Sequence, residues 1–379
     1  MSPTDLSARH PSACDLTAAH IRAIAPYQPG KPTAELQREL GLTHIVKLAS
    51  NENPLGVSPH ALQAMQDQLE TLALYPDGNG YGLKSAIAAR FGVSREQIVL
   101  GNGSNDILEF AARAFLGAGT SAVYSRHAFA VYPLATQTVG ARGIEVPARN
   151  YGCDLTAMVD AIEADTRVLF IANPNNPTGT FIPAQELLAA FRRVPAHVLI
   201  VLDEAYTEYL TAEDAYDSLG WLAEFPNLLV SRTFSKAYGL AGLRVGFGVA
   251  SLEVIDLLNR VRPPFNVNTL ALAAAEAALA DTGFLARSVA LNRAGMAQVT
   301  RGLGDLGLET IPSWGNFVAF RVGDGAAVYQ ALLRKGVIVR PIANYGMPEW
   351  LRVSIGLASE NATFLAALAT ILGKGTELA

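Results

Sequence analysis

The chain has 379 residues, half of them hydrophobic, and a formal net charge of −5. A chain of this length exceeds the size at which one hydrophobic core stops growing, so we expect two domains, and the apolar fraction argues against extensive disorder. The acidic balance and the lack of a basic stripe argue against nucleic-acid binding.

Three further features indicate a cytoplasmic protein without metal or membrane partners. No apolar run reaches the ~18–20 residues that a membrane-spanning helix needs, and the polar N-terminal segment lacks the apolar stretch of a signal peptide. The two cysteines, Cys14 and Cys153, form no CxxC pair and are expected to be reduced thiols. The six histidines never show HxxxH or HExxH spacing, so we expect no metal site.

The elements are predicted from the hydrophobic pattern, read along the chain. Residues 1–45 form an arm of weak periodicity with several prolines. From about residue 80, short β-rich runs alternate with helical stretches, and most of the runs are continuously hydrophobic, which is typical of parallel strands buried on both faces. The predicted strands are 97–100, 122–124, 143–146, 168–172, 198–202, 228–231 and 245–249.

The stretches between these strands have helical periodicity, as in residues 106–116, so we predict an α/β sandwich with helices on both faces of a mainly parallel, seven-stranded sheet. After Pro263 and Pro264 an alanine-rich helix begins, followed by strands near 316–322, 337–340 and 351–355. We therefore expect residues 1–75 to form an arm and part of a small domain, 76–265 a large domain, and 266–379 a linking helix and the rest of a small α+β domain.

A glycine-rich turn, GNGSND (101–106), connects a predicted strand to a predicted helix. Free backbone N–H groups and the helix dipole at such a point favour a phosphate, although a purely structural turn capped by Ser104 explains the pattern equally well. The turn is not GxGxxG, and no acidic residue clearly serves a ribose. A nicotinamide oxidoreductase is therefore disfavoured.

Two polar motifs follow the next buried strands. NPNNPTG (173–179) can be only a turn, yet its prolines and asparagines place Asn176 at the carboxyl edge of the sheet, where its amide can donate to a phenolic oxygen. In DEAY (203–206), Asp203 is either a helix cap or a functional charge. Burial would raise its pKa unless a cation such as a protonated pyridine nitrogen lies opposite, and Tyr206 could then hydrogen-bond the phenolate of that ring.

The segment SRTFSKAYGLAGLR (231–244) contains the strongest candidate nucleophile, Lys236. A lysine after a strand is usually a solvated surface charge. At the mouth of an apolar core, however, it loses hydration, which lowers its pKa and frees the amine to attack a carbonyl. Thr233, Ser235 and Arg244 supply donors suited to a phosphate.

In this order and strand context the motifs resemble fold type I pyridoxal-phosphate aminotransferases, in the class II histidinol-phosphate aminotransferase group. The resemblance extends from about residue 25 to residue 357. It is carried by KLASNENPLG (47–56), YPDGNGYGLKSAIA (75–88), GNGSND (101–106), NPNNPTG (173–179), DEAY (203–206), SRTFSKAYGLAGLRVGF (231–247) and RPIANYGMPEWLRVSIG (340–356).

The resemblance implies pyridoxal 5′-phosphate as cofactor, bound to Lys236 as a Schiff base, with Lys236 later acting as general base. It implies that Asp203 pairs with the pyridinium nitrogen, that Asn176 and Tyr206 bind the ring oxygen, and that Phe129 stacks on the ring where the family often has tyrosine. The residues expected at the cofactor phosphate are Ser104, Asn105, Thr233, Ser235 and Arg244. The family often has an acid at the position of Asn105, but the expected contact is a backbone amide.

Further residues follow from the resemblance for the dimer and for the substrate. Tyr75 matches a tyrosine that reaches the phosphate from a neighbouring subunit, which implies a homodimer. Arg352 matches an arginine that binds a substrate anion, Arg340 and Tyr27 are further donors for a substrate phosphate, and Asn53 lies in a loop that lines the pocket.

The implied reaction is transamination between an amino donor and a keto acceptor: L-histidinol phosphate with 2-oxoglutarate, giving imidazole acetol phosphate and glutamate in histidine biosynthesis. An aromatic aminotransferase acting on phenylalanine or tyrosine is the nearest alternative. A decarboxylase of the phosphothreonine type is less favoured. A non-catalytic pyridoxal-phosphate-binding regulator is disfavoured because the chain has no helix-turn-helix extension or basic patch.

Overall fold

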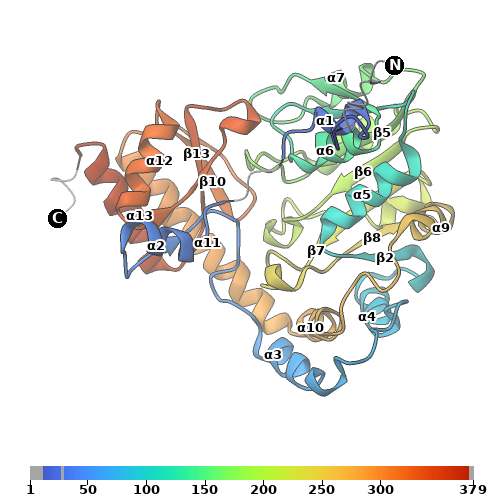
Figure 1. Ribbon diagram of the computed structural model, residues 1–379, viewed down its shortest axis with the longest axis horizontal. Helices are drawn as coiled ribbons and strands as arrows, with labels where there is room; N and C mark the ends of the chain where they lie inside the picture. The colour runs from blue at the N-terminus through green and yellow to red at the C-terminus, as the bar shows by residue number, and fades with distance from the viewer. Residues whose placement is uncertain (1–11, 27–29, 375–379) are drawn as a thin grey trace, which may run out of the picture.

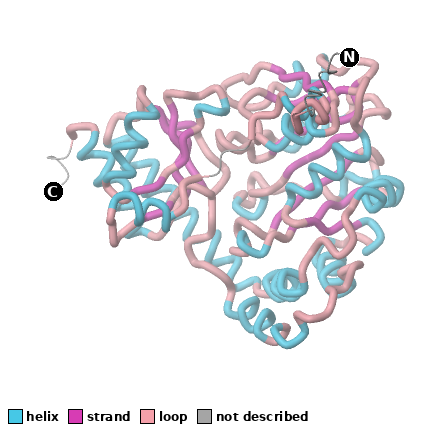
Figure 2. The backbone as a smooth tube through the Cα atoms, viewed as in Figure 1, coloured by secondary structure: helices cyan, strands magenta, loops and turns pink. Residues whose placement is uncertain are grey.

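The computed structural model describes residues 12–26 and 30–374, and it contains a large and a small sheet in separate parts of the molecule (Figures 1 and 2). In the large sheet only β8 runs antiparallel to its neighbours; all other neighbouring pairs are parallel. The strands of this sheet, in spatial order, are β2 (Ile98–Gly101), β8 (Gly246–Ala250), β7 (Leu228–Thr233), β6 (Leu199–Asp203), β5 (Thr166–Ala172), β3 (Ser121–Ser125) and β4 (Arg142–Val146).

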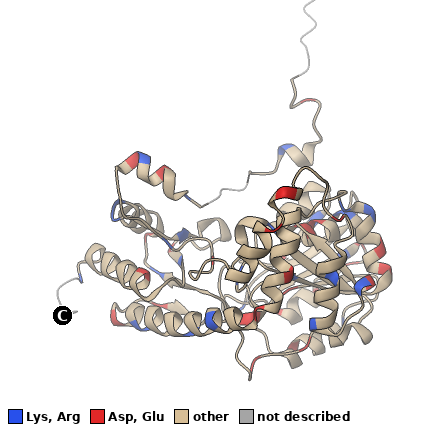
Figure 3. Ribbon diagram, turned by 90° about the horizontal axis from the view of Figure 1, so that it is seen from below, with Lys and Arg blue, Asp and Glu red and all other residues tan. Residues whose placement is uncertain are grey.

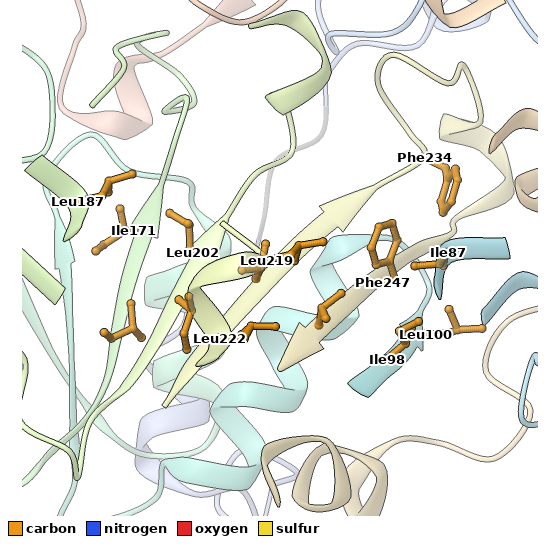
Figure 4. Packing of buried hydrophobic residues seen from close by; sticks show 14 of the residues in the cluster. Ile87, Ile98, Leu100, Ile171, Leu187, Leu202, Leu219, Leu222, Phe234 and Phe247 are labelled. Atoms are coloured by element: carbon orange, nitrogen blue, oxygen red, sulfur yellow. The ribbon is translucent and has the colours of Figure 1, made fainter. Parts of the chain in front are cut away.

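Helices cover both faces of the large sheet because successive strand residues point to opposite sides. In β5, Leu169 and Ile171 join one buried cluster, whereas Val168 and Phe170 join the other. The first cluster, part of which is drawn in Figure 4, packs against α4 (Tyr81–Phe91), α7 (Leu155–Asp160), α8 (Ala184–Phe191) and α10 (Thr269–Ala280). The second packs against α5 (Ser104–Phe115), α6 (Val131–Thr138) and α9 (Leu252–Val261). The predicted α/β sandwich with a mainly parallel seven-stranded sheet is confirmed.

The small sheet is antiparallel and lies against three helices at the left of Figure 1. Its strands, in spatial order, are β12 (Arg340–Pro341), β13 (Trp350–Ser354), β10 (Phe317–Arg321) and β9 (Thr310–Ile311). The covering helices are α11 (Thr282–Asp305), α12 (Gly325–Arg334) and α13 (Ala358–Ile371).

N-terminal segments pack against both parts of the molecule. β1 (Val46–Lys47) pairs in parallel with β11 (Val337–Ile338) beside the small sheet. The predicted strand 337–340 is thus two short strands, because Arg340 pairs with β13 instead. The remaining helices are α1 (Ala19–Arg22), which lies against α6, α2 (Thr33–Leu40), and α3 (Pro59–Gln66), which packs on α10. The domain limits at 75 and 265 stay a prediction.

Short 3₁₀ turns complete the described chain: η1 (Leu69–Thr71), η2 (Arg95–Gln97), η3 (Thr207–Tyr209), η4 (Gly220–Ala223), η5 (Ala241–Leu243) and η6 (Ala343–Tyr345). Within residues 12–26 and 30–374, no single helix has the length and hydrophobicity to cross a bilayer; α10 and α11 meet that criterion only when joined, and they are bent by 79°. Acidic and basic residues lie interspersed along the ribbon in Figure 3.

Candidate active site

The carboxyl ends of β5, β6 and β7 meet at one edge of the large sheet. In the parallel register Ala172 lies opposite Asp203, and Asp203 lies opposite Ser231. The three motifs that follow these strands therefore converge, as ligand sites of such sheets do. A cavity of about 290 Å³ opens there. The sequence-predicted residues that line it are Ser104, Asn105, Phe129, Asn176, Asp203, Tyr206, Thr233, Ser235, Lys236, Arg244, Arg340 and Arg352.

Lys236 presents its amine to this cavity just beyond the end of β7. Nζ donates a hydrogen bond to the backbone oxygen of Ser50 at 3.1 Å and lies 5.8 Å from the centre of the Tyr206 ring. Desolvation, assisted by the nearby guanidinium of Arg352, lowers the pKa of Lys236 to about 8. About a tenth of the amine is therefore neutral and nucleophilic at pH 7, far more than in an unperturbed lysine.

Asp203 ends β6 with its carboxylate buried at the cavity, only 5% exposed. The hydroxyl of Tyr132, on α6, donates to Oδ2 at 2.9 Å, whereas Oδ1 has no hydrogen-bond partner within the described residues. Burial raises the pKa of Asp203 to about 6, and the Tyr132 hydrogen bond counteracts that rise. A buried anionic oxygen without a donor suits a cationic N–H group of a ligand.

Tyr206 is held from the small sheet through Asn51. The amide Nδ2 of Asn51 donates to the Tyr206 hydroxyl at 2.9 Å. Asn51 is fixed in turn by Ser354 of β13, whose hydroxyl accepts from the Asn51 backbone N–H at 2.8 Å and donates to Oδ1 at 3.0 Å. Burial raises the pKa of Tyr206 to about 12, so its hydroxyl remains a proton donor across the physiological range.

At one end of the cavity, groups that favour an anion surround the N-terminus of α5; we call Ser104, Asn105, Thr233, Ser235 and Arg244 the anion cradle. The guanidinium of Arg244 donates to the Ser235 hydroxyl at 3.2 Å and to the backbone oxygen of Asn102 at 3.3 Å. Because the first backbone N–H groups of a helix lack intrahelical acceptors, this end of α5 adds further donors and a favourable dipole.

On the small-sheet side, Arg340 and Arg352 lie directly opposite each other on β12 and β13. Both are buried, at 9% and 6% exposure, and both line the cavity. Arg352 donates to the backbone oxygen of Ala49 at 2.9 Å and to the amide oxygen of Asn176. Two buried arginines at paired positions of neighbouring strands give this side of the cavity positive charge, and a guanidinium fork matches carboxylates and phosphates.

Asn176 and Phe129 complete the lining on the large-sheet side. Asn176 uses its amide oxygen for Arg352, so its amide nitrogen is the end that can donate to a ligand. The loop that carries it is braced by Asn173, which donates to the Ile182 oxygen at 3.0 Å and accepts from the Ile182 N–H at 2.8 Å. Half-buried Phe129 supplies an aromatic ring to the lining.

Two of the predicted residues that the structure describes are not brought into this cavity. Tyr75 is 83% exposed and stacks on Phe265, with ring centres 4.8 Å apart. Asn53 turns away from the lining because its amide donates to the Ala237 oxygen and the Ser288 hydroxyl, each at 2.8 Å. Tyr27 lies outside the described residues.

Sequence reasoning missed Ser50, Asn51, Glu52 and Tyr345, which line the cavity, and Tyr132, which contacts Asp203 from behind. The first three belong to the recognised motif KLASNENPLG, although Asn53, the residue that the sequence analysis chose from this motif, does not line the cavity. Tyr132 carries no local signal, because a tyrosine on the buried face of a helix resembles any core aromatic.

Most of the chain matches known proteins. The sequence profile of the family "Aminotransferase class I and II" matches residues 43–368. Histidinol-phosphate aminotransferase 1 of Thiobacillus denitrificans is 64% identical over 364 residues, covering 95% of both chains. Histidinol-phosphate aminotransferase of Methylobacillus flagellatus is 63% identical over 360 residues, covering 94% of this chain and 98% of its own.

A solved structure agrees with these relatives. The crystal structure of histidinol-phosphate aminotransferase from Sinorhizobium meliloti in complex with pyridoxal-5′-phosphate superimposes with a TM-score of 0.86 at 28% identity. The match covers 94% of this chain and 97% of that one. The group indicated by the sequence motifs is therefore confirmed by independent comparison of sequence and of fold.

Proposed function

This chain belongs to the aminotransferase class I and II family, and from that premise we propose that it catalyses pyridoxal-phosphate-dependent transamination between L-histidinol phosphate and 2-oxoglutarate, in the cytoplasm, as a step of histidine biosynthesis. The observation that carries the proposal is that Lys236 and Asp203 line one cavity with the anion cradle at its end. An amine, a buried carboxylate and a phosphate site in one cavity are the three groups that this cofactor requires of a protein.

The chemistry of the cavity fits pyridoxal phosphate. When bound, the cofactor supplies an aldehyde that condenses with amines and a protonated ring that draws electrons from the reacting carbon. The carboxylate of Asp203, with Oδ1 lacking a donor within the described chain, is suited to accept from the ring N–H. The anion cradle is suited to the phosphate, and the hydroxyl of Tyr206 and the amide nitrogen of Asn176 to the ring oxygen.

Lys236 is the residue that we assign to proton transfer. Its Nζ takes the proton that leaves the amine-bearing carbon of the donor and returns a proton to the carbonyl carbon of the acceptor. The lowered pKa, to about 8, suits this role, because a group that must accept and donate works best when its pKa lies near the working pH. The hydrogen bond to the Ser50 oxygen keeps the amine at the mouth of the cavity.

The Arg340–Arg352 pair is the proposed binding site for the anionic end of each substrate. Glutamate carries a carboxylate and L-histidinol phosphate a phosphate, and a guanidinium fork binds either one through two hydrogen bonds. Because both arginines are buried, their attraction for an anion is weakly screened by water. One positive surface can therefore serve both half-reactions.

The catalytic assignment is tested by replacing Lys236. Lys236→Ala is expected to lose the yellow colour of the holoenzyme and to lower kcat/KM by about 10²–10⁴-fold or more, since proton transfer alone contributes that much. Lys335→Ala, which removes an exposed lysine, is the matched control and should retain full activity. A Lys236→Ala protein whose kcat/KM stays within about tenfold of the Lys335→Ala value would refute the assignment.

The substrate assignment has a separate test, in which kcat/KM is measured for L-histidinol phosphate, phenylalanine and tyrosine under identical conditions. We expect L-histidinol phosphate to be preferred, because its phosphate meets two buried arginines. A higher kcat/KM for either aromatic amino acid would transfer the assignment to an aromatic aminotransferase.

We also propose that the chain acts as a homodimer. Tyr75 lies among exposed apolar side chains that a single chain leaves in water, and such a patch is typical of an interface. Tyr75 and Phe265 stack on each other, and the exposed residues Leu69, Leu72 and Leu74 shortly precede Tyr75 in the chain. Light scattering should give twice the chain mass. A monomer that retains full activity would overturn both the dimer and the proposed role of Tyr75 at the partner's phosphate.

A further inference from the structure

Tyr132 links a helix on the back of the large sheet to the floor of the cavity. It lies on α6, is fully buried, and donates its hydroxyl proton to Oδ2 of Asp203 at 2.9 Å. The two residues are 71 positions apart in the chain. Tyr132 does not line the cavity itself, so any influence that it has on a ligand passes through its neighbours.

The ring of Tyr132 is held on two sides by aromatic side chains. It stacks on Phe170 of β5, with ring centres 4.9 Å apart and an interplanar angle of 6°. Its other contact is edge-on with Phe129, at 6.0 Å and 87°. These are favoured geometries for aromatic pairs, so the hydroxyl has little freedom to leave Asp203. Phe129 lines the cavity, and Tyr132 therefore also supports that ring from behind.

The hydrogen bond from Tyr132 makes the two carboxylate oxygens of Asp203 different. Oδ2 is occupied by Tyr132, and Oδ1 is buried without a hydrogen-bond partner among residues 12–26 and 30–374. A carboxylate free to rotate about its Cβ–Cγ bond would present either oxygen. Because Oδ2 is fixed by Tyr132, Oδ1 points in a defined direction. A ligand donor can therefore bind Oδ1 without a further loss of rotamer entropy of the Asp203 side chain.

We propose that Tyr132 is a positioning residue for the cofactor: its hydroxyl orients Asp203 toward the ring nitrogen of pyridoxal phosphate and keeps the carboxylate anionic in a buried site. The inference rests on the proposed function, since it presupposes that cofactor. Tyr132 contacts neither substrate nor cofactor in this role.

The same contact predicts a pH effect. The charged and titratable groups around Asp203 are Tyr132 from α6, Glu204 next in the chain, Tyr206, and Lys236 beyond β7. Burial and Glu204 raise the pKa of Asp203, whereas the hydrogen bond from Tyr132, the backbone N–H of Ala205 and the charge of Lys236 lower it. Removing the Tyr132 hydroxyl therefore raises the pKa of Asp203 further. Because the ring nitrogen requires the anionic carboxylate, a protein without this hydroxyl should lose the cofactor at a higher pH than the parent protein does when the pH is lowered.

The test measures the Kd of pyridoxal phosphate for the cofactor-free protein as a function of pH. Tyr132→Phe keeps the ring contacts and removes only the hydroxyl. It should raise the Kd about tenfold, as expected for a lost hydrogen bond to a charged group, and move the acidic limb of the binding curve to higher pH. Tyr124→Phe is the matched control: Tyr124 is buried in the same core, and its hydroxyl lies against Gly143.

Asp203→Asn, alone and combined with Tyr132→Phe, shows whether Tyr132 acts through Asp203. Asp203→Asn should weaken binding, and adding Tyr132→Phe to it should change the Kd by less than about twofold, because coupled sites are not additive. A Tyr132→Phe protein that matches Tyr124→Phe in Kd and pH dependence overturns the inference. So does an undiminished effect in the Asp203→Asn background.

These outcomes are distinct from failure of the proposed function. A kcat/KM that stays near the parent value in Lys236→Ala refutes the catalytic assignment whatever Tyr132 does. Asp203→Asn that binds the cofactor normally refutes both the role of Asp203 and that of Tyr132. Weakened binding in Asp203→Asn with none in Tyr132→Phe leaves the function standing and removes only the positioning role.

Discussion

Replacing Gly246 by alanine is expected to disturb the anion cradle from below. Gly246 lies in β8 between Gly101 of β2 and Thr233 of β7. A Cβ at this position would lie 2.6 Å from the carbonyl carbon of Gly103, 2.6 Å from the backbone nitrogen of Ser104 and 2.8 Å from the Arg232 oxygen. All three atoms are backbone, so no side chain can rotate away. Either the sheet or the N-terminus of α5 must move.

Overpacking of this kind typically costs about 1–3 kcal/mol. We therefore expect Gly246→Ala to lower the free energy of unfolding of the cofactor-free protein by about that amount in urea titrations. Since the displaced Ser104 N–H is one of the proposed phosphate donors, the Kd of pyridoxal phosphate should also rise, by about 10–100-fold at ~1.4 kcal/mol per tenfold change.

Gly242→Ala provides the control for this prediction. Gly242 is an exposed glycine close by in the chain, and a Cβ built there meets nothing within 4 Å. It should behave like the parent protein in both measurements. If Gly246→Ala unfolds at the same urea concentration and binds the cofactor as tightly as Gly242→Ala, the close approach of β8 to the cradle has no energetic consequence and the reasoning is refuted.

Three further predictions follow from the site and its surroundings. Arg340→Gln should reduce kcat/KM for L-histidinol phosphate more than for phenylalanine, and equal losses would remove its phosphate role. In the cofactor-free protein the pKa of Lys236 is lowered from 10.5 to about 8, so between those pH values the unfolded chain binds more protons than the folded one, and the contribution of Lys236 to stability rises with pH. Lys236→Met should therefore be more stable than the parent protein at neutral pH, and this difference should shrink as the pH rises from about 8 to 10.5. Urea titrations at several pH values measure the difference. Arg232→Met leaves the Glu204 side chain, which is 0% exposed, as an unpaired charge and should lower the free energy of unfolding by about 3–5 kcal/mol. Arg260→Ala breaks an exposed ion pair and should lower it by about 0–1 kcal/mol. Similar losses in the two variants would contradict the effect of burial.

The sequence carries strong local information about the large sheet and the motifs at its edge. A strand buried on both faces needs a continuous apolar run, so β5 and β6 end within one residue of the point where polar residues begin. β7 instead continues through the polar residues Ser231, Arg232 and Thr233. Parallel strands place those ends together, so the sequence alone predicts Asn176, Asp203 and Lys236 at one edge of the sheet. The split of 337–340 into β11 and β12 was not foreseen, because a run of four apolar and basic residues contains no sign that its halves pair with different partners.

By itself, then, the amino-acid order determined the fold class and the chemical types that follow the strands, and it located the ends of the seven large-sheet strands to within about two residues, because these features depend on the pattern of neighbouring residues. Only the tertiary structure decided which polar atoms meet. The hydroxyl of Tyr132 reaches Asp203 across 71 positions and the amide of Asn51 reaches Tyr206 across 155, while the amide of Asn53 is taken up by Ala237 and Ser288. Such contacts depend on how helices and sheets pack against each other. That packing results from many weak burial terms distributed over the whole chain, and no single segment encodes it.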